Sequence, residues 1–473
     1  MPKPRYASVR TLVDVQAGDE APILDSNALV LHFPGPQTVT GEDVLELHVH
    51  GGPATVKAVL SAIPRCASDG VIRYAEPGEF TKRAFLNDRL DLAQVESLGD
   101  TLSADTEQQR RAAVRGSSGV LGRTYESWRE QLLLARGEIE ALIDFSEDQH
   151  FDESPSELMS NVSALVADMR HSIRVHEGAS QRSELLRNGI RIALLGPPNV
   201  GKSSLMNLVV GREASIVSME AGTTRDIVEV SLDMRGYLCS FADTAGIRTK
   251  LAAGESGDLF EPVLGIVEEE GIRRAKQKAS ESDIIIVLAA VESGPDGGFR
   301  INYDAETLKL ASKAQACLIV VNKRDAVDAA SFSTLLEQFR NEAASHIPNI
   351  STMELITISC REAQAKTTGQ NDPGAIHGLI DRLVESFAGM TSLPVDQQDL
   401  LGVTARQAQL LEQCRGFLDE FMTVAHPEEE DGEEPDIVLA AEHLRYAAES
   451  LAKITGRVES GDVEEVLGVI FEK

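Results

Sequence analysis

The sequence predicts a multidomain protein that combines an α/β domain with α-helical segments. Its 473 residues exceed what a single hydrophobic core usually supports. Strand-like and helical runs alternate between residues 188 and 390, which is typical of a parallel sheet covered by helices. On both sides of this region apolar residues recur three and four positions apart, which indicates amphipathic helices. A smaller α+β domain is expected before them.

The order of these patterns predicts four segments. Residues 1–88 mix short apolar runs with turns, and the alternation from Leu45 to His50 predicts a strand. Residues 89–187 and 391–473 are expected to form one discontinuous helical domain, because helical patterns both precede and follow the α/β region. The α/β domain, residues 188–390, is then inserted into the helical domain. The acidic run at 426–436 is expected to be a solvated loop.

Composition limits the classes of function. The net charge of −30 argues against a protein that binds nucleic acid through its overall field, although a local basic patch or a basic partner stays open. The longest apolar runs, DIIIVLAAV and ACLIVVNK, are of strand length. A membrane-spanning helix needs roughly 20 apolar residues, so no transmembrane span is predicted.

Neither the cysteines nor the histidines indicate a metal centre. The five cysteines are scattered and form no CxxC pair, which predicts a reducing compartment without disulfides or a cysteine-built zinc site. His48 and His50 alternate on the predicted strand but have no third ligand nearby in the sequence. Packing or a polar sheet edge is therefore the favoured interpretation of the two histidines.

The stretch GPPNVGKSS, which begins at Gly196, carries the clearest chemistry. It follows the apolar run RIALL, precedes a helical run and matches the phosphate-binding pattern GxxxxGK[ST] in the context that the pattern requires. Backbone N–H groups of such a loop surround phosphates, Lys202 neutralises β and γ oxygens, and the Ser203 hydroxyl suits Mg²⁺. Asn199 adds a side-chain carbonyl that could bind a monovalent cation beside the phosphates, as one reading of the loop.

Two further motifs are expected around magnesium and the terminal phosphate. AGTTRD supplies Thr223 and Thr224, one of whose hydroxyls reaches Mg²⁺. DTAG follows the strand YLCSFA and places Asp243 near the ion and the amide of Gly246 near the γ-phosphate.

The last two motifs distinguish guanine from adenine. NKRD ends the strand CLIVV, and Asp325 there can accept hydrogen bonds from N1–H and the exocyclic amine of guanine. Asn322 and Lys323 pack the loop and the base. ISC, which ends at Cys360, fits the loop that contacts guanine O6. The five motifs in this order predict a GTP hydrolase with a P-loop (Ras-like) domain.

The residue after Gly246 is Ile247, where many such enzymes carry a glutamine that orients the attacking water. An aliphatic side chain cannot position water, so another group or a partner must complete the site. Glu268, in VEEEGIRRA, is the candidate. The alternative, that Glu268 to Glu270 form a solvated helix start, stays open.

These motifs, together with RYAEPGEFTKRAFLNDRLDLAQVESLGD, TGEDVLELHVHGGP and LAKITGRV, resemble the MnmE (TrmE) family of GTPases that modify the wobble uridine of tRNA. The resemblance covers nearly the whole chain. It implies a folate-binding-like N-terminal domain that forms a homodimer and binds a tetrahydrofolate derivative of the 5-formyl or 5,10-methylene type. It also implies an FAD- and NADH-using partner, MnmG, with which the protein installs a carboxymethylaminomethyl or taurinomethyl group at C5. GTP hydrolysis would depend on K⁺ and follow pairing of two G domains.

The resemblance also assigns roles to residues. Glu268 would orient the water, with Lys202 and Thr224 as the other catalytic residues. Ser203 and Thr224 fall at the Mg²⁺ positions; the K⁺ positions are Asn199, Ser218, Glu220 and Thr223. Glu46 and Arg89 fall at folate-binding positions, the family often having lysine at the latter. The residues expected to contact GTP are Asn199, Val200, Gly201, Lys202, Ser203, Ser204, Thr223, Thr224, Asp243, Thr244, Ala245, Gly246, Asn322, Lys323, Asp325, Ser359 and Cys360.

The chain departs from the family at both ends. The family's opening strand, with a folate-binding arginine, and its closing Phe-Cys-x-Gly-Lys tail have no counterpart here. We expect the sequence to be incomplete; the alternative is that the protein has lost part of the modification chemistry. Inserts at 249–265 and near 430 suggest a mitochondrial, fungal-type member, with the bacterial cytoplasm as the alternative location. tRNA is expected to be contacted through the complex with the partner.

The sequence leaves two other functions as alternatives. The first is a GTPase switch in ribosome assembly or RNA binding, but neither a KH-type GxxG loop nor a second P-loop is present in the sequence. The second is a folate-binding scaffold whose G domain binds GTP without turnover.

Overall fold

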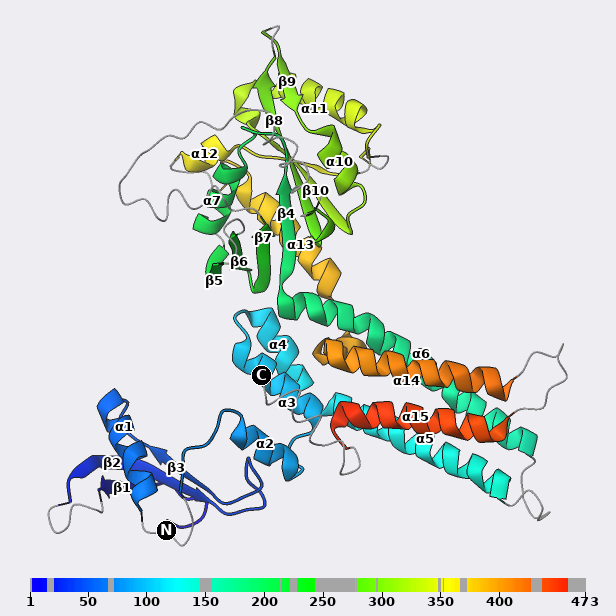
Figure 1. The fold of residues 1–473 in the computed structure, drawn as a ribbon. Coiled ribbons are helices and arrows are strands. Elements are labelled where there is room, and N and C mark those ends of the chain that lie inside the picture. Colours follow the sequence, from blue (N-terminus) through cyan, green and yellow to red (C-terminus); the bar gives the residue numbers. More distant parts are fainter. Residues whose placement is uncertain are drawn as a thin grey trace. The chain divides into compact units, whose positions relative to one another are not determined.

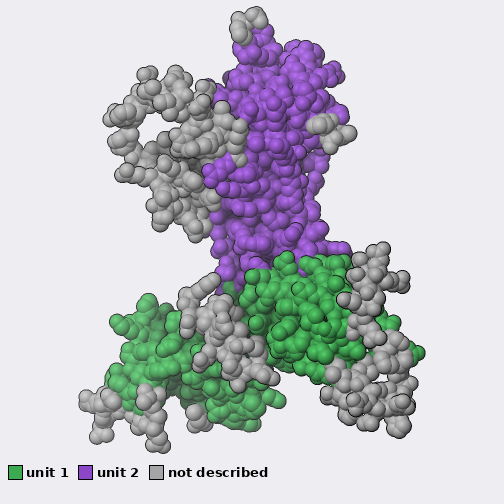
Figure 2. Space-filling view, turned by 45° about the vertical axis from the view of Figure 1, so that its right-hand side comes forward, with its two compact units in different colours: residues 1–99, 116–175, 406–473 green, residues 100–115, 176–405 purple. Residues whose placement is uncertain are grey.

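The computed structural model groups the chain into two compact units, coloured separately in Figure 2. Unit 1 comprises residues 1–99, 116–175 and 406–473, and unit 2 comprises residues 100–115 and 176–405. The structure describes residues 2–14, 21–66, 72–144, 155–212, 214–221, 228–242, 277, 279–294, 297–347, 350–351, 353–365, 372–426 and 436–457.

Unit 1 begins with a three-stranded antiparallel sheet in the order β1 (Ser8–Val13), β2 (Ile23–Phe33) and β3 (Val44–His48). Val30 and Ala28 of β2 are buried, so one face of the sheet forms a small core. The strand expected at Leu45–His50 is confirmed as β3, two residues shorter at its end. Two helices follow, α1 (Pro53–Ala62) and α2 (Glu79–Leu86), with a 3₁₀ turn, η2 (Ile63–Arg65), after α1.

The other described residues of unit 1 are mainly helical, as the apolar periodicity predicts. Its long helices are α5 (Val120–Asp144), α14 (Ala405–Ala425) and α15 (Ile437–Thr455), while α3 (Leu92–Ser103) and α6 (Pro155–Asn188) continue into unit 2. α15 packs along α5, as Figure 1 shows. Buried residues of α5, such as Tyr125, Leu132 and Ile139, recur at helical spacing and provide the apolar face.

Unit 2 contains an eight-stranded sheet in the order β11-β10-β8-β4-β7-β6-β5, with β9 paired to β8. Strands β4, β7, β8, β10 and β11 pair in parallel; β5, β6 and β7 pair antiparallel, and so do β8 and β9. The strands are β4 (Ile190–Leu195), β5 (Ala214–Ala221), β6 (Val228–Met234), β7 (Tyr237–Ala242), β8 (Ile284–Ser293), β9 (Phe299–Asn302), β10 (Ala316–Asn322) and β11 (Leu355–Thr357). The parallel α/β architecture predicted for this region is confirmed.

The central strand β8 is buried on both faces. Ile284, Ile286 and Leu288 belong to one hydrophobic cluster, whereas Ile285 and Val287 belong to another. This is the period-two alternation of a strand with packed layers on both sides. The helices of unit 2 are α4 (Glu107–Gly116), α7 (Lys202–Arg212), α10 (Ala305–Ala311), α11 (Ala329–Ala343), α12 (Cys360–Gln364) and α13 (Ile376–Thr391), with 3₁₀ turns η3 (Arg324–Ala326) and η4 (Val395–Gly402).

A helical segment from before the α/β region packs against β7 within unit 2. The backbone N–H of Gln108, in α4, donates to the carbonyl of Gly236 at 3.0 Å, in the turn before β7. Tyr237 packs against a buried cluster of Ala112, Leu186 and Leu401. α4 and the end of α6 therefore group with the α/β domain, and the predicted domain boundaries stay a prediction.

The described part of the chain contains neither a membrane-spanning helix nor a metal-binding cluster of side chains. None of its helices has the length and apolar character needed to cross a membrane. Among the same residues, no three His, Cys, Asp or Glu side chains cluster in a way that could hold a metal ion.

Gly456, which ends α15, offers a test of the helical packing. Its φ of 76° is left-handed, and a Cβ there would lie 2.6 Å from the Phe85 ring. We expect Gly456→Ala to lower the free energy of unfolding by about 2 kcal/mol, because an L-residue is strained in this conformation and meets the ring. Urea unfolding followed by circular dichroism measures the change.

The matched control is Gly416→Ala in the interior of α14, where a Cβ meets nothing within 4 Å. That variant should be more stable by about 0.5–1 kcal/mol, since alanine favours helix over glycine. Equal effects of the two substitutions would contradict the packing described for Gly456.

Candidate nucleotide site and N-terminal polar network

The phosphate-binding loop connects β4 to α7, as the sequence predicts. Gly196 has a φ of 152°, and a Cβ there would lie 2.1 Å from the carbonyl oxygen of Leu288 on β8. Only glycine lets the loop pass this close to the neighbouring strand. The Nζ of Lys202 donates to the carbonyls of Gly196 at 2.6 Å and Pro197 at 2.8 Å, so the lysine lies across the loop.

Asn322, the last residue of β10, joins the phosphate-binding loop to the base-binding loops. Its Nδ2 donates to the carbonyl of Val200 at 2.8 Å. Its Oδ1 accepts from the backbone N–H groups of Lys323 at 2.8 Å and Cys360 at 3.2 Å. The side chain is buried, so these hydrogen bonds form away from water.

Asp325 lies in η3, directly after this strand. Its Oδ1 accepts a hydrogen bond from the Ser359 hydroxyl at 2.6 Å, and its Oδ2 lies 3.9 Å from Nη1 of Arg361. The Ser359 oxygen also accepts from the N–H of Glu362 and caps α12. The structure therefore brings Asn322, Asp325, Ser359 and Cys360 together, as the sequence motifs predict.

Burial raises the pKa of the Cys360 thiol to about 11. The thiol therefore stays protonated at neutral pH and can neither attack a substrate nor repel one by charge. Its part in the site is the backbone N–H that it donates to Asn322.

Glu292, near the end of β8, belongs to none of the sequence motifs. Its Oε1 lies 3.0 Å from Nζ of Lys323, and its Oε2 accepts from Asn302 at 2.9 Å. The carboxylate thus holds the lysine that the motif places beside the base. Its position near the carboxyl end of a parallel strand, where ligand-binding residues gather, is the sequence feature that could identify it.

The residues expected to hold metal ions are only partly described. Asn199 and Ser203 are exposed on the phosphate-binding loop and at the start of α7, and both offer the oxygen ligands that K⁺ and Mg²⁺ take. Ser218 and Glu220 lie on β5. The positions expected to complete the site lie outside the described residues: Thr223, Thr224, Asp243, Thr244, Ala245, Gly246 and Glu268.

The two residues expected to bind folate have separate partners. Glu46 on β3 lies 3.1 Å from Nε2 of His48. Arg89 donates from Nε to the carbonyl of Thr38 at 2.9 Å. Arg89 therefore helps to position the loop between β2 and β3, and both side chains stay at the surface of the N-terminal region.

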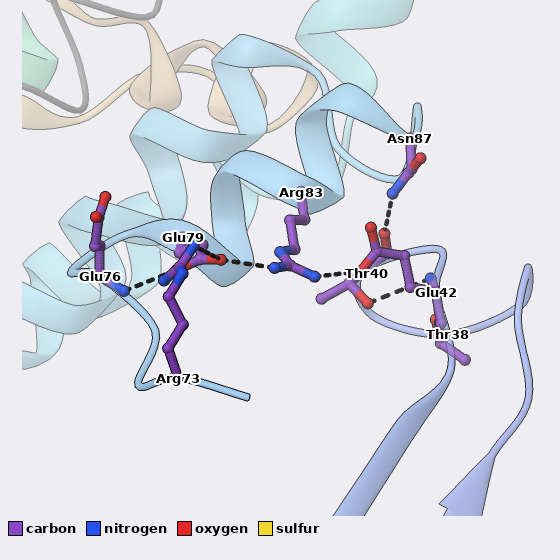
Figure 3. Close-up of polar contacts among 8 residues, drawn as sticks. All are labelled: Thr38, Thr40, Glu42, Arg73, Glu76, Glu79, Arg83 and Asn87. Atoms are coloured by element: carbon purple, nitrogen blue, oxygen red, sulfur yellow. Dashed lines mark hydrogen bonds and ion pairs between the residues drawn. The ribbon is translucent and has the colours of Figure 1, made fainter. Parts of the chain in front are cut away.

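The same loop is held by α2 through a chain of polar contacts (Figure 3). Asn87 donates to the carbonyl of Thr40 at 2.8 Å, and Arg83 bridges Glu42 and Glu79, each at 2.7 Å. Arg73 completes the chain on the other side of Glu79. Arg73, the N–H of Glu76 and Arg83 together lower the pKa of Glu79 from 4.5 to about 2.

Comparison with known proteins gives matches over the whole chain. Residues 92–473 match the family model described as MnmE helical domain, and residues 1–89 match the GTP-binding protein TrmE N-terminus. The chain is 37% identical to the tRNA modification GTPase MnmE of Paramagnetospirillum magneticum, covering 100% of this chain and 90% of the relative.

Two mitochondrial proteins match as well. The human 5-taurinomethyluridine-[tRNA] synthase subunit GTPB3 is 35% identical, over 100% of this chain and 85% of its own length. The tRNA modification GTPase MSS1 of Saccharomyces cerevisiae is 34% identical, over 96% of this chain and 80% of its own length.

Replacing Asn322 tests whether it joins the two ends of the nucleotide site. Asn322→Ala leaves three backbone groups without their hydrogen-bond partner. Each lost hydrogen bond costs about 1 kcal/mol of free energy. We expect GTP to bind roughly 30- to 150-fold more weakly. Titration with a fluorescent GTP analogue measures the affinity, and a melting curve confirms that the variant is folded.

Asn341→Ala, on the exposed side of α11, is the matched control and should bind GTP as the wild type does. Unchanged affinity in a folded Asn322→Ala variant would show that the loops keep their spacing without this amide.

The network around Glu79 predicts a dependence of stability on pH. Because its pKa is lowered on folding, the carboxylate stabilises the fold above pH 4.5, and this contribution is lost as the pH falls through about 2. Glu79→Gln removes the titrating group. Between pH 5 and 2 the variant should therefore lose less unfolding free energy than the wild type, as measured by urea unfolding at each pH.

Glu412→Gln, on the exposed side of α14, serves as control and should follow the wild-type pH dependence. Identical slopes for wild type and Glu79→Gln would rule out the stabilising role of the network.

Proposed function

This chain belongs to the MnmE (TrmE) family of tRNA modification GTPases, and from that premise we propose that it couples GTP hydrolysis to modification of the wobble uridine of tRNA at C5. The observation that carries the proposal is the joint placement of Asn322, Asp325 and Ser359 beside the phosphate-binding loop. In this arrangement one ligand can contact Lys202 with its phosphates and Asp325 with its base.

Guanine recognition is assigned to the carboxylate of Asp325. An ionised carboxylate only accepts hydrogen bonds, and guanine presents two adjacent donors, N1–H and the exocyclic amine. Adenine does not present that pair. Ser359 fixes the rotation of the carboxylate, because its hydroxyl already donates to Oδ1. The geometry thus favours guanine over adenine nucleotides.

The hydrolytic step is proposed to use two cations and the glutamate Glu268. Mg²⁺ would be held by Ser203 and Thr224, and K⁺ by Asn199 with the segment of Ser218, Glu220 and Thr223. Both would neutralise charge on the phosphates when bound. Glu268 is proposed to orient the attacking water, with Lys202 on the phosphate oxygens.

The N-terminal region is proposed to bind a tetrahydrofolate derivative through Glu46 and Arg89 and to form a homodimer. Large apolar side chains exposed there support an interface: Tyr6, Val9, Ile23, Tyr74 and Phe80 are each about 60% exposed. Exposed apolar groups of this number on one small domain are typical of a surface that another chain covers.

The partner and location follow from the same proposal. An MnmG-like FAD protein would supply the redox chemistry and much of the tRNA contact, because a chain with a net charge of −30 has little attraction for tRNA. We propose a mitochondrial location, as for GTPB3 and MSS1, rather than the bacterial cytoplasm of MnmE. Organelle fractionation of the source cells, probed with an antibody against this chain, would decide between them.

Asp325→Asn tests guanine recognition. The amide of asparagine can donate as well as accept, so it loses the pairing with guanine and suits the C2 oxygen of xanthine. We expect the variant to bind GTP at least about 100-fold more weakly than the wild type, because two hydrogen bonds to a charged group are lost. It should bind xanthosine triphosphate more tightly than the wild type does. Unchanged GTP affinity would refute the assignment; Glu337→Gln on α11 is the control.

The GTPase rate in KCl and NaCl tests the hydrolytic step. If K⁺ neutralises charge in the transition state, hydrolysis in KCl should be roughly 100-fold faster than in NaCl at equal ionic strength. In KCl, Glu268→Ala should bind GTP normally and hydrolyse it about 100-fold or more slowly. Equal rates in the two salts would exclude the K⁺ site, and a wild-type rate in Glu268→Ala would exclude its role.

A further inference from the structure

A buried carboxylate at the start of β2 has no part in the sites above. The side chain of Asp25 is only 1% exposed. It accepts backbone hydrogen bonds from His50 at 2.8 Å and from Asn27 at 2.9 Å, and both of its oxygens lie 3.0 Å from Nδ1 of His50. These contacts, first of all the N–H of His50, lower the pKa of Asp25 to about 2. Asp25 is therefore ionised at neutral pH.

The carboxylate fixes the state of the His50 ring. An ionised carboxylate can only accept, so the hydrogen of the neutral imidazole must reside on Nδ1. Nε2 then carries the lone pair, on a side chain that is 70% exposed. A buried carboxylate that orients an exposed imidazole is the arrangement used for general acid–base catalysis.

Other charged groups near this end of the sheet are either paired with a residue other than His50 or positively charged. Glu46 of β3 contacts His48, and Asp14, after β1, forms an ion pair with Arg65. α1, which begins three residues after His50, carries one charged residue, Lys57. Among the described residues, Asp25 is thus the carboxylate in contact with His50.

We propose that His50, positioned by Asp25, is the proton-transfer residue of the N-terminal one-carbon site. The inference rests on the proposed function, in which Glu46 contacts a tetrahydrofolate derivative. His50 follows Glu46 by four residues and lies two residues beyond the end of β3, so at most about 13 Å of chain separates them, a span that such a molecule can bridge.

The step assigned to His50 opens a methylene bridge between N5 and N10 of the folate. The protonated imidazole gives its Nε2 proton to N10, the carbon–N10 bond breaks, and its electron pair stays on N10. The lone pair of N5 forms a double bond to the carbon, which becomes an iminium electrophile. A primary amine then adds to that carbon and loses a proton to Nε2, which restores the imidazolium. No oxidant or reductant is consumed in these steps.

The experiment measures single-turnover tRNA modification by the complete chain with its FAD-dependent partner and methylenetetrahydrofolate, across pH 5–9. We expect His50→Gln to slow modification by about 100-fold or more and to abolish the pH dependence that the imidazole imposes. Imidazole in the buffer should restore the rate of His50→Gly. Asp25→Asn should slow modification and shift the pH profile, because it no longer fixes the ring hydrogen on Nδ1.

His48→Gln, the neighbouring exposed histidine, is the matched control and should not respond to imidazole. GTP hydrolysis should be unchanged in all variants, because its residues lie in unit 2. A melting curve of each variant shows whether unit 1, which carries the substitutions, is folded. A wild-type modification rate in His50→Gln would overturn the inference and leave the proposed function standing. Slow modification of His50→Gly that imidazole does not restore would show that the contact between Asp25 and His50 is only structural. That result would overturn the inference too. A wild-type chain that modifies no tRNA would overturn the proposed function itself.

Discussion

Three loops of the α/β domain meet at the side chain of Asn322, and the geometry of the nucleotide site depends on that one amide. It donates to a carbonyl of the phosphate-binding loop and accepts from two backbone N–H groups of the base-binding loops. A carboxylate could not donate, and an ammonium could not accept, so no charged side chain serves all three. The spacing between the phosphate end and the base end of the site is therefore set by one rigid planar group.

The support beneath these loops is the central strand β8, which has packed layers on both faces. Two of its residues serve the site in different ways. Leu288 limits how the phosphate-binding loop can pass, while Glu292 holds the lysine of the base-binding motif. A doubly buried strand is among the last parts of a domain to open, so the loops next to it are held by a stable element.

The sequence was most informative where function or burial follows a short local pattern. The strands of unit 2 alternate or run apolar, and the GxxxxGKS and NKRD motifs bring their own loop geometry, so these elements were predictable. Contacts between residues far apart in the chain were not. Nothing local links Asp25 to His50, or Arg83 to Glu42, since those pairs form only when the strands and α2 pack together. The roles of Glu268 and the threonines, which lie outside the described residues, stay predictions.

The contact of α4 with the turn before β7 bears on how this protein can be dissected. By sequence the α/β domain ends where the helices begin, but Tyr237 and the carbonyl of Gly236 are covered by residues from α4, α6 and η4. A fragment of residues 188–390 would expose an aromatic side chain and a hydrogen-bond acceptor at one end of β7. The other end of that strand leads directly into DTAG. Kinetic constants measured on such a fragment would therefore describe a catalytic loop whose supporting strand has lost part of its packing.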